Sequence, residues 1–122
     1  MSATVAIRGW IECDDEQLKQ VEAVIAAAAP AEPEYAKGWV VPRGSGSWTN
    51  YVFFGASVKE RLAEWLRPQL EQIAALQPVS ADEYVRGLFF VGSESGVAHE
   101  WLIKDGKLLE SDASNKYVYL DA

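Results

Sequence analysis

The chain has 122 residues, of which 49% are hydrophobic and 24% are charged, and its formal net charge is -7. This length and composition predict one globular domain, residues 1–122, that is large enough to bury a hydrophobic core. The negative charge repels phosphate backbones, so nucleic-acid binding is disfavoured and a basic protein is the favoured macromolecular partner. The single cysteine, Cys13, excludes an intramolecular disulfide bond and an all-cysteine zinc site.

Membrane and export signals are the next features to consider. No apolar stretch approaches the roughly 20 residues that span a bilayer. No basic segment followed by an apolar run stands at the N-terminus. We therefore expect a cytoplasmic protein that does not contact a membrane.

The first third of the chain predicts a strand, a helix and a second, short strand. Apolar and polar residues alternate over residues 4–13, which indicates a strand with one buried face. Asp14 or Asp15 then caps a helix that ends before Pro30. A linker rich in proline and glutamate follows, then a short strand over residues 38–41 and a flexible glycine and serine turn over residues 43–47.

The stretch 48–76 organises the predicted fold. Its aromatic run, residues 48–54, predicts a strand that turns at Gly55. Ser57 and Glu60 have the spacing of a capping box, so we expect the longest helix to begin at Val58. Because an interior proline removes a hydrogen bond and clashes with the preceding turn, Pro68 predicts a kink or a division into two short helices at Arg67.

The last third predicts strands alone. Residues 84–91 and 97–104 are strand candidates, and Asp105-Gly106 is a two-residue hairpin signal that returns the chain over residues 107–111. Residues 117–120 are a candidate for a final short edge strand. The order predicts an α+β fold: an antiparallel sheet with two helices on one face, with a split βαβ (ferredoxin-like) core plus a C-terminal β-meander. A differently ordered α+β sheet is the alternative.

A search for catalytic groups finds no set that predicts an enzyme, a cofactor or a metal site. His99 is the sole histidine and shares a strand face with apolar residues, which favours a structural role over a general base. Cys13 has no neighbouring histidine that would activate it. The alternative function is a small-ligand-binding or enzymatic domain with a pocket between the sheet and the long helix, using Arg43, Tyr51 or His99.

Aromatic residues are more numerous than a core of this size requires. If the predicted motif is right, one face of the sheet is not covered by helices, and Trp10 and Glu12 lie on it. Tryptophan anchors beside carboxylates are typical of a protein-binding surface that recognises a basic partner. The candidate contact residues are Trp10, Glu12, Asp14, Asp15, Trp48, Glu94 and Glu100. A second small core or a homodimer interface would use the same aromatic residues.

In size, acidity and tryptophan-rich strands, the chain resembles the immunity proteins of bacterial polymorphic-toxin and contact-dependent inhibition systems. The resemblance extends over the whole chain and includes no motif, so it assigns no residue. It implies an inhibitor that neutralises a cognate toxin domain, often a basic nuclease, by covering its active site or a neighbouring surface. These proteins have many unrelated folds, so the fold does not test the resemblance.

Overall fold

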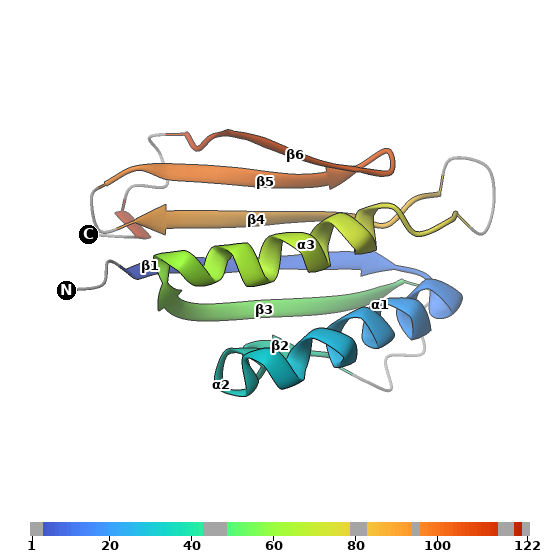
Figure 1. Cartoon of the computed structure of the whole chain (residues 1–122). Coiled ribbons are helices and arrows are strands. Elements are labelled where there is room, and N and C mark those ends of the chain that lie inside the picture. The colour runs from blue at the N-terminus through green and yellow to red at the C-terminus, as the bar shows by residue number, and fades with distance from the viewer. Residues whose placement is uncertain (1–3, 43–48, 79–82, 94–95, 115–118, 121–122) are drawn as a thin grey trace.

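A six-stranded antiparallel sheet carries two main helices on one face (Figure 1). The computed structural model describes residues 4–42, 49–78, 83–93, 96–114 and 119–120. Their strands are β1 (Thr4–Cys13), β2 (Trp39–Val40), β3 (Asn50–Lys59), β4 (Arg86–Ser93), β5 (Ala98–Lys104) and β6 (Lys107–Asp112). Their helices are α1 (Asp15–Ala28), α2 (Pro33–Ala36) and α3 (Ala63–Ala74), with single 3₁₀ turns at Ala29–Ala31 and Glu60–Leu62.

The strand order is β2-β3-β1-β4-β5-β6, and every neighbouring pair is antiparallel. Strands β1 to β4 with α1 and α3 therefore form the predicted split βαβ core, in which β1 lies between β3 and β4. Strands β5 and β6 extend the sheet beyond β4 as the predicted meander. The α+β prediction with two helices on one face is confirmed.

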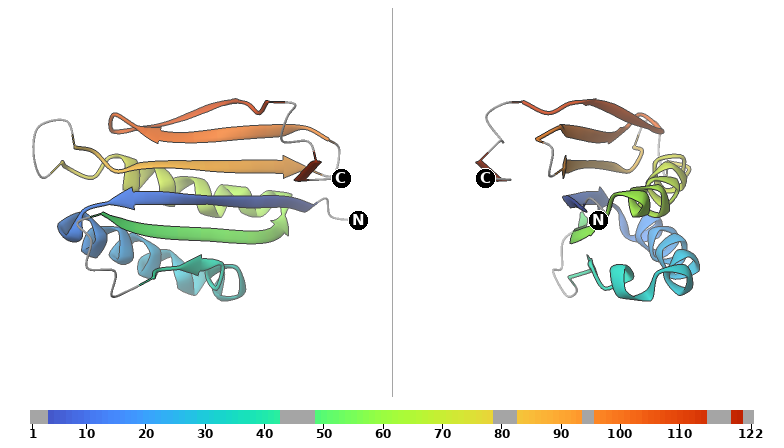
Figure 2. Two further views of the ribbon diagram at one scale, coloured as in Figure 1. Left: turned by 180° about the vertical axis from the view of Figure 1, so that it is seen from behind. Right: turned by 60° about the vertical axis from the view of Figure 1, so that its left-hand side comes forward.

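The hydrophobic core lies between the sheet and the two helices. Alternate residues of β1, including Ile7 and Ile11, are buried there at 1% and 0% exposure. Leu66, Leu70 and Ile73 of α3 are fully buried against them. Figure 2 shows that α1 and α3 both lie on this one side, so neither of these two helices covers the opposite face of the sheet.

The N-terminus of α1 forms as the sequence predicts. Asp14 is the N-cap: its Oδ1 accepts a hydrogen bond from the backbone N–H of Gln17 at 2.7 Å. The Gln17 side chain returns the contact, because its Oε1 accepts from the Asp14 backbone N–H at 3.0 Å. This reciprocal pair is a capping box, and it satisfies two donors that the first helical turn leaves free.

The predicted start of the second helix is wrong. Instead of turning at Gly55, β3 continues to Lys59, and Ser57 pairs with Ala6 of β1 rather than capping a helix. Val58 is 2% exposed and pairs with Val5, so pairing with the full length of β1 outweighs the local capping signal. No side-chain hydrogen bond caps the helix, which begins at Ala63 after the 3₁₀ turn.

Three further expectations differ from the structure. Helix α3 runs from Ala63 to Ala74 with Pro68 inside it, so the expected division into two short helices at Arg67 is wrong, whereas the alternative, a kink, stays a prediction. The proline and glutamate linker contains the short helix α2. Of the expected last strand, residues 117 and 118 lie outside the described residues, and Tyr119 and Leu120 belong to no strand.

Candidate functional site

The sheet face opposite α1 and α3, here called the open face, carries a continuous row of apolar side chains. The register places Val40, Phe53 and Trp10 in line on β2, β3 and β1. The line continues through Leu88, Leu102 and Leu109 on β4, β5 and β6. This apolar row, made up of Val40, Phe53, Trp10, Leu88, Leu102 and Leu109, therefore crosses all six strands.

The row is accessible to a partner. Val40, Phe53 and Leu109 are 55%, 43% and 42% exposed, and Trp10, Leu88 and Leu102 are half-buried by their neighbours. Tyr51 stacks on Phe53 with ring centroids 6.3 Å apart and enlarges the apolar area. A continuous apolar patch of this extent on a protein surface is typical of an interaction surface.

Charged side chains border the row on both sides. On one side, the register aligns Glu12, Arg86 and Lys104 across β1, β4 and β5. On the other side, it aligns Arg8, Phe90 and Glu100 across the same strands. A shallow hollow of about 440 Å³ lies beside the row, between the Trp10 and Lys104 side chains.

Trp10 is held in place by a short polar chain. Its indole Nε1 donates to Glu12 Oε2 at 2.9 Å, and Glu12 Oε1 lies 3.8 Å from Arg86 Nη2. The indole N–H therefore has a partner while the ring remains on the open face. An aromatic side chain fixed in this way loses little conformational freedom on binding, which favours its use as an anchor.

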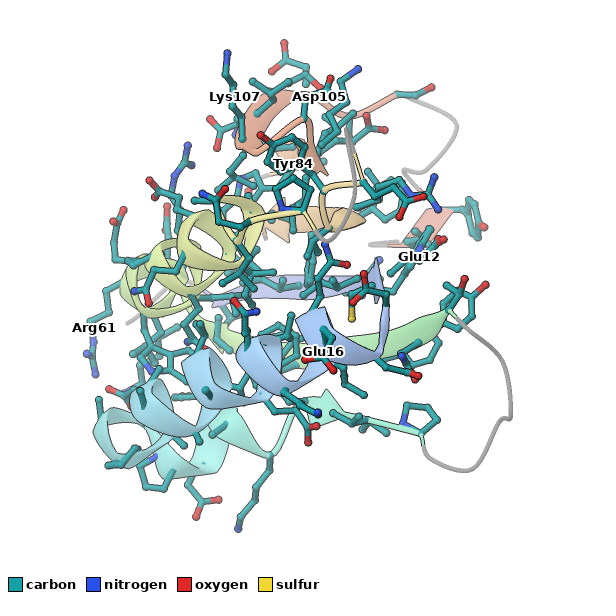
Figure 3. The ribbon with its side chains drawn as sticks, turned by 90° about the vertical axis from the view of Figure 1, so that its right-hand side faces the viewer. Glu12, Glu16, Arg61, Tyr84, Asp105 and Lys107 are labelled. Atoms are coloured by element: carbon teal, nitrogen blue, oxygen red, sulfur yellow. The ribbon has the colours of Figure 1, made fainter. Side chains whose placement is uncertain are left out.

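Acidic side chains lie close together at the end of the sheet where β1 finishes and α1 begins, next to the open face. Glu12, Asp14, Glu83 and Asp105 line a hollow of about 410 Å³ here, together with Arg86 and Lys104. Asp15 and Glu16 follow at the start of α1. Figure 3 shows Glu12, Glu16, Tyr84 and Asp105 at this end of the molecule. We call these six acidic residues the acidic end: Glu12, Asp14, Asp15, Glu16, Glu83 and Asp105.

Asp14 and Asp15 of the acidic end also contribute to the fold. Asp14 caps α1 through the reciprocal contact with Gln17, and the Gln17 Nε2 donates to the Glu83 carbonyl oxygen at 2.8 Å. Asp15 Oδ1 accepts from Asn50 Nδ2 at 2.8 Å. Because these contacts connect α1, β3 and the segment before β4, they fix the positions of the carboxylates at this end.

Cys13 lies at the wall of the same hollow and is 5% exposed. Burial raises the pKa of the Cys13 thiol to about 12, and the nearby negative charges of Asp14 and Asp15 add to the effect. The thiolate is the nucleophilic form, so this cysteine is unreactive at neutral pH. The hollow therefore provides charged groups for contact and no activated nucleophile at Cys13.

His99 lies on the helix side of the sheet, in a separate hollow of about 360 Å³ between α3 and strands β4 to β6. Nearby, Glu110 Oε1 accepts from Arg67 Nη1 and from Trp101 Nε1, each at 2.8 Å. The hydrogen bond from Arg67, and then that from Trp101, lowers the pKa of Glu110. Arg67 also lies 5.5 Å from the Trp101 ring centroid. The side chains of Arg67, Trp101 and Glu110 therefore satisfy one another's hydrogen bonds, as in a structural network.

The predicted contact residues fall into three groups. Trp10, Glu12 and Glu100 share the open face, with Glu12 at its border with the acidic end. Asp14 and Asp15 lie on the acidic end. Trp48 and Glu94 lie outside the described residues. The alternative ligand contacts were expected in a pocket between the sheet and the long helix. His99 does line the hollow beside α3, whereas Tyr51 lies on the open face and Arg43 is outside the described residues.

Sequence reasoning missed most of the apolar row. Phe53, Leu88, Leu102 and Leu109 each alternate with a core residue, so their strands read as ordinary amphipathic strands. Their alignment into one row depends on the register between strands distant in sequence, which periodicity within one strand does not reveal. The one signal that the sequence did contain is that each strand carries an apolar residue among the polar residues of its solvent side.

Comparison of the chain with protein-family models, with curated proteins and with solved structures yields no match. Within the described ranges, histidine, cysteine and carboxylate side chains form no group of three that could hold a metal ion. None of the described helices is both long and apolar enough to cross a membrane.

Proposed function

We propose that the protein is a protein-binding inhibitor of the immunity type, which neutralises a basic toxin or enzyme by occluding it. The docking surface is the open face together with the acidic end. The observation that carries the proposal is the apolar row, because six aligned apolar side chains on a sheet face that neither α1 nor α3 covers are suited to burial against another protein.

The two parts of this surface have different tasks. The apolar row supplies the area that is buried, with Trp10 as its central anchor between Phe53 and Leu88. The acidic end supplies the long-range field that attracts a basic partner and raises the association rate. Such a field is weakened by salt, so the association rate of the complex should fall as ionic strength rises.

The deciding experiment begins with affinity capture from the native host at low and high salt, followed by reconstitution with the captured basic protein. Trp10→Ala and Leu102→Ala should each weaken the purified complex at least tenfold, because central anchors dominate interface energy. Val97→Ala is the matched control, since Val97 is 53% exposed but lies beside His99 on the helix side. Equal affinity for all three variants, or an association rate independent of salt, would contradict the proposal.

A second candidate function, binding of a small ligand, is favoured by the hollow beneath α3. Val5, Val91 and Trp101 give it an apolar floor, and Glu60 and Glu64 stand at its rim, so it suits a small organic cation. Thermal-shift measurements with aromatic and aliphatic amines would test it. A shift that persists in a Glu60→Gln, Glu64→Gln double variant would count against binding at this hollow.

A further inference from the structure

The charges beside the apolar row are arranged in opposite order on two strands. On β1, Arg8 precedes Trp10 by two residues and Glu12 follows it by two. On β5, Glu100 precedes Leu102 by two residues and Lys104 follows it by two. Both strands run in the same direction, since each is antiparallel to β4. Each strand therefore presents one cation and one anion, on opposite sides of the row.

We propose that the free protein is a two-fold symmetric dimer in which the open faces of two copies pack together. The two-fold axis lies along the apolar row, so each residue of the row meets its own equivalent. The rotation exchanges the two sides of the row. It therefore brings Glu12 against the partner's Arg8, and Lys104 against the partner's Glu100. Because the symmetry repeats each pair, four ion pairs of opposite charge border one apolar seam.

The same rotation is compatible with the remaining strands. Arg86 of β4 comes over the partner's Phe90, and a guanidinium over an aromatic face is an attractive contact. Each charged residue on one side of the row therefore faces an attractive group of the second copy. The pairs are Glu12 with Arg8, Arg86 with Phe90, and Lys104 with Glu100. An arrangement that slides one copy by two residues along the strands would lose this correspondence, so the charges also select the register of the dimer.

The available area is sufficient for such a dimer. Five strands about 4.8 Å apart, with about six residues of each at about 3.4 Å per residue, and the short strand β2 together cover about 520 Å² on each copy. Two faces together bury about 1,000 Å², which reaches the threshold expected of a specific protein interface. Sheets that pack face to face in this way keep their strands within about 30° of each other, which an axis close to the row permits.

This inference deepens the proposed function and rests on it in one respect, because it concerns the regulation of the same face. A toxin or enzyme that docks on the open face has to displace the second copy. Self-association then keeps the apolar row covered while no target is present. In the dimer, Asp15 and Glu16 of the acidic end lie at the start of α1, on the helix side of the sheet, and continue to attract a basic target.

Charge reversal tests the dimer directly. Glu100→Lys and Lys104→Glu should each raise the dimer dissociation constant at least tenfold, because each places like charges opposite each other twice. The double variant carrying both changes restores opposite charges and should restore dimerisation. Lys19→Glu is the control for net charge, since Lys19 is an exposed residue of α1. Sedimentation velocity over a concentration series measures all five proteins, including the unchanged chain, and circular dichroism verifies their folding.

The outcomes separate the dimer from the proposed function. A monomeric unchanged chain, or single variants that dimerise as it does, would overturn the dimer. Loss of dimerisation in both single variants without recovery in the double variant would overturn the two-fold register. In each case the captured basic protein can still be assayed for binding, and its capture by a monomeric Lys104→Glu variant would leave the inhibitor proposal standing. A dimer that captures no basic protein would contradict the inhibitor proposal alone.

Discussion

The two faces of the sheet are built from the same strands but differ in burial. On the helix side, Ile7 and Ile11 of β1 are almost completely buried beneath α1 and α3. On the open face, the intervening Arg8 and Trp10 remain partly accessible. The helix side therefore contributes most of the hydrophobic stability, whereas the open face leaves apolar area available for association. Substitutions on the two faces should separate folding from binding.

The largest contrast is expected between two adjacent residues of β4. Phe89 is fully buried on the helix side, and Leu88 lies next to it on the open face. Phe89→Ala should lower the free energy of unfolding by about 3–5 kcal/mol, because it leaves a cavity in the core. Leu88→Ala should lower it by about 1 kcal/mol or less and should weaken association instead. Urea denaturation of dilute protein measures both, and equal losses would contradict the division of tasks.

A pair of glycines provides the next contrast. A Cβ atom at Gly9, on the helix side of β1, would lie 2.3 Å from the Leu88 carbonyl oxygen and 2.6 Å from the Phe89 ring. A Cβ atom at Gly55, on the open face of β3, would meet nothing within 4 Å. Gly9→Ala should therefore cost about 1–3 kcal/mol of stability through overpacking. Gly55→Ala is the control, and the comparison fails if it destabilises the fold as much as Gly9→Ala.

Much of the architecture could be predicted from local sequence signals. The alternation in residues 4–13 identified β1, and the pair Asp14 and Asp15 identified the start of α1, of which Asp14 is the cap. Asp105 and Gly106 adopt positive φ angles of 53° and 78°, as their hairpin signal predicted. These features depend on residues close together in the chain, so one sequence contains enough information to locate them.

The errors occur where distant pairing decides the structure. Ser57 and Glu60 have the spacing of a helix cap, yet β1 is long enough to hold residues 55–59 in a strand. The surface proposed for contact could be anticipated from the sequence only in part, for the same reason. Trp10 was found as a conspicuous tryptophan, but its neighbours Phe53, Leu88 and Leu102 come from three other strands and become a surface only through the register.

Asp14 both caps α1 and belongs to the acidic end, so substitutions at this residue can separate the stability of the fold from the proposed binding. Asp14→Ala removes the N-cap of α1 and should cost about 1 kcal/mol of stability. Asp14→Ser retains a capping oxygen but removes the charge, so it should preserve stability and reduce only the association rate with a basic partner. Denaturation and stopped-flow binding distinguish the two effects. A serine variant as unstable as the alanine variant would show that the charge itself stabilises the helix.

The smallest effect is expected on β6, which lies beyond the meander strand β5 at the edge of the sheet. Hydrogen bonds from Arg67 and Trp101 lower the pKa of Glu110 below its ordinary value of 4.5, so the folded state favours the carboxylate. The resulting stability is present above pH 4.5 and is lost as the pH falls through the lowered pKa.

Glu110→Gln should therefore lower the free energy of unfolding at pH 7 by less than about 1 kcal/mol, because the side chain is partly exposed and solvent screens the pair. The difference from the unchanged chain should shrink as the pH falls through the lowered pKa of Glu110, because the unchanged chain then also carries a neutral side chain. Glu71→Gln is the matched control, since it removes the same charge from a longer contact, 3.7 Å, with Arg67. If the loss in Glu110→Gln stayed constant over the whole acid titration of the unchanged chain, packing of the side chain rather than its charge would account for the contribution.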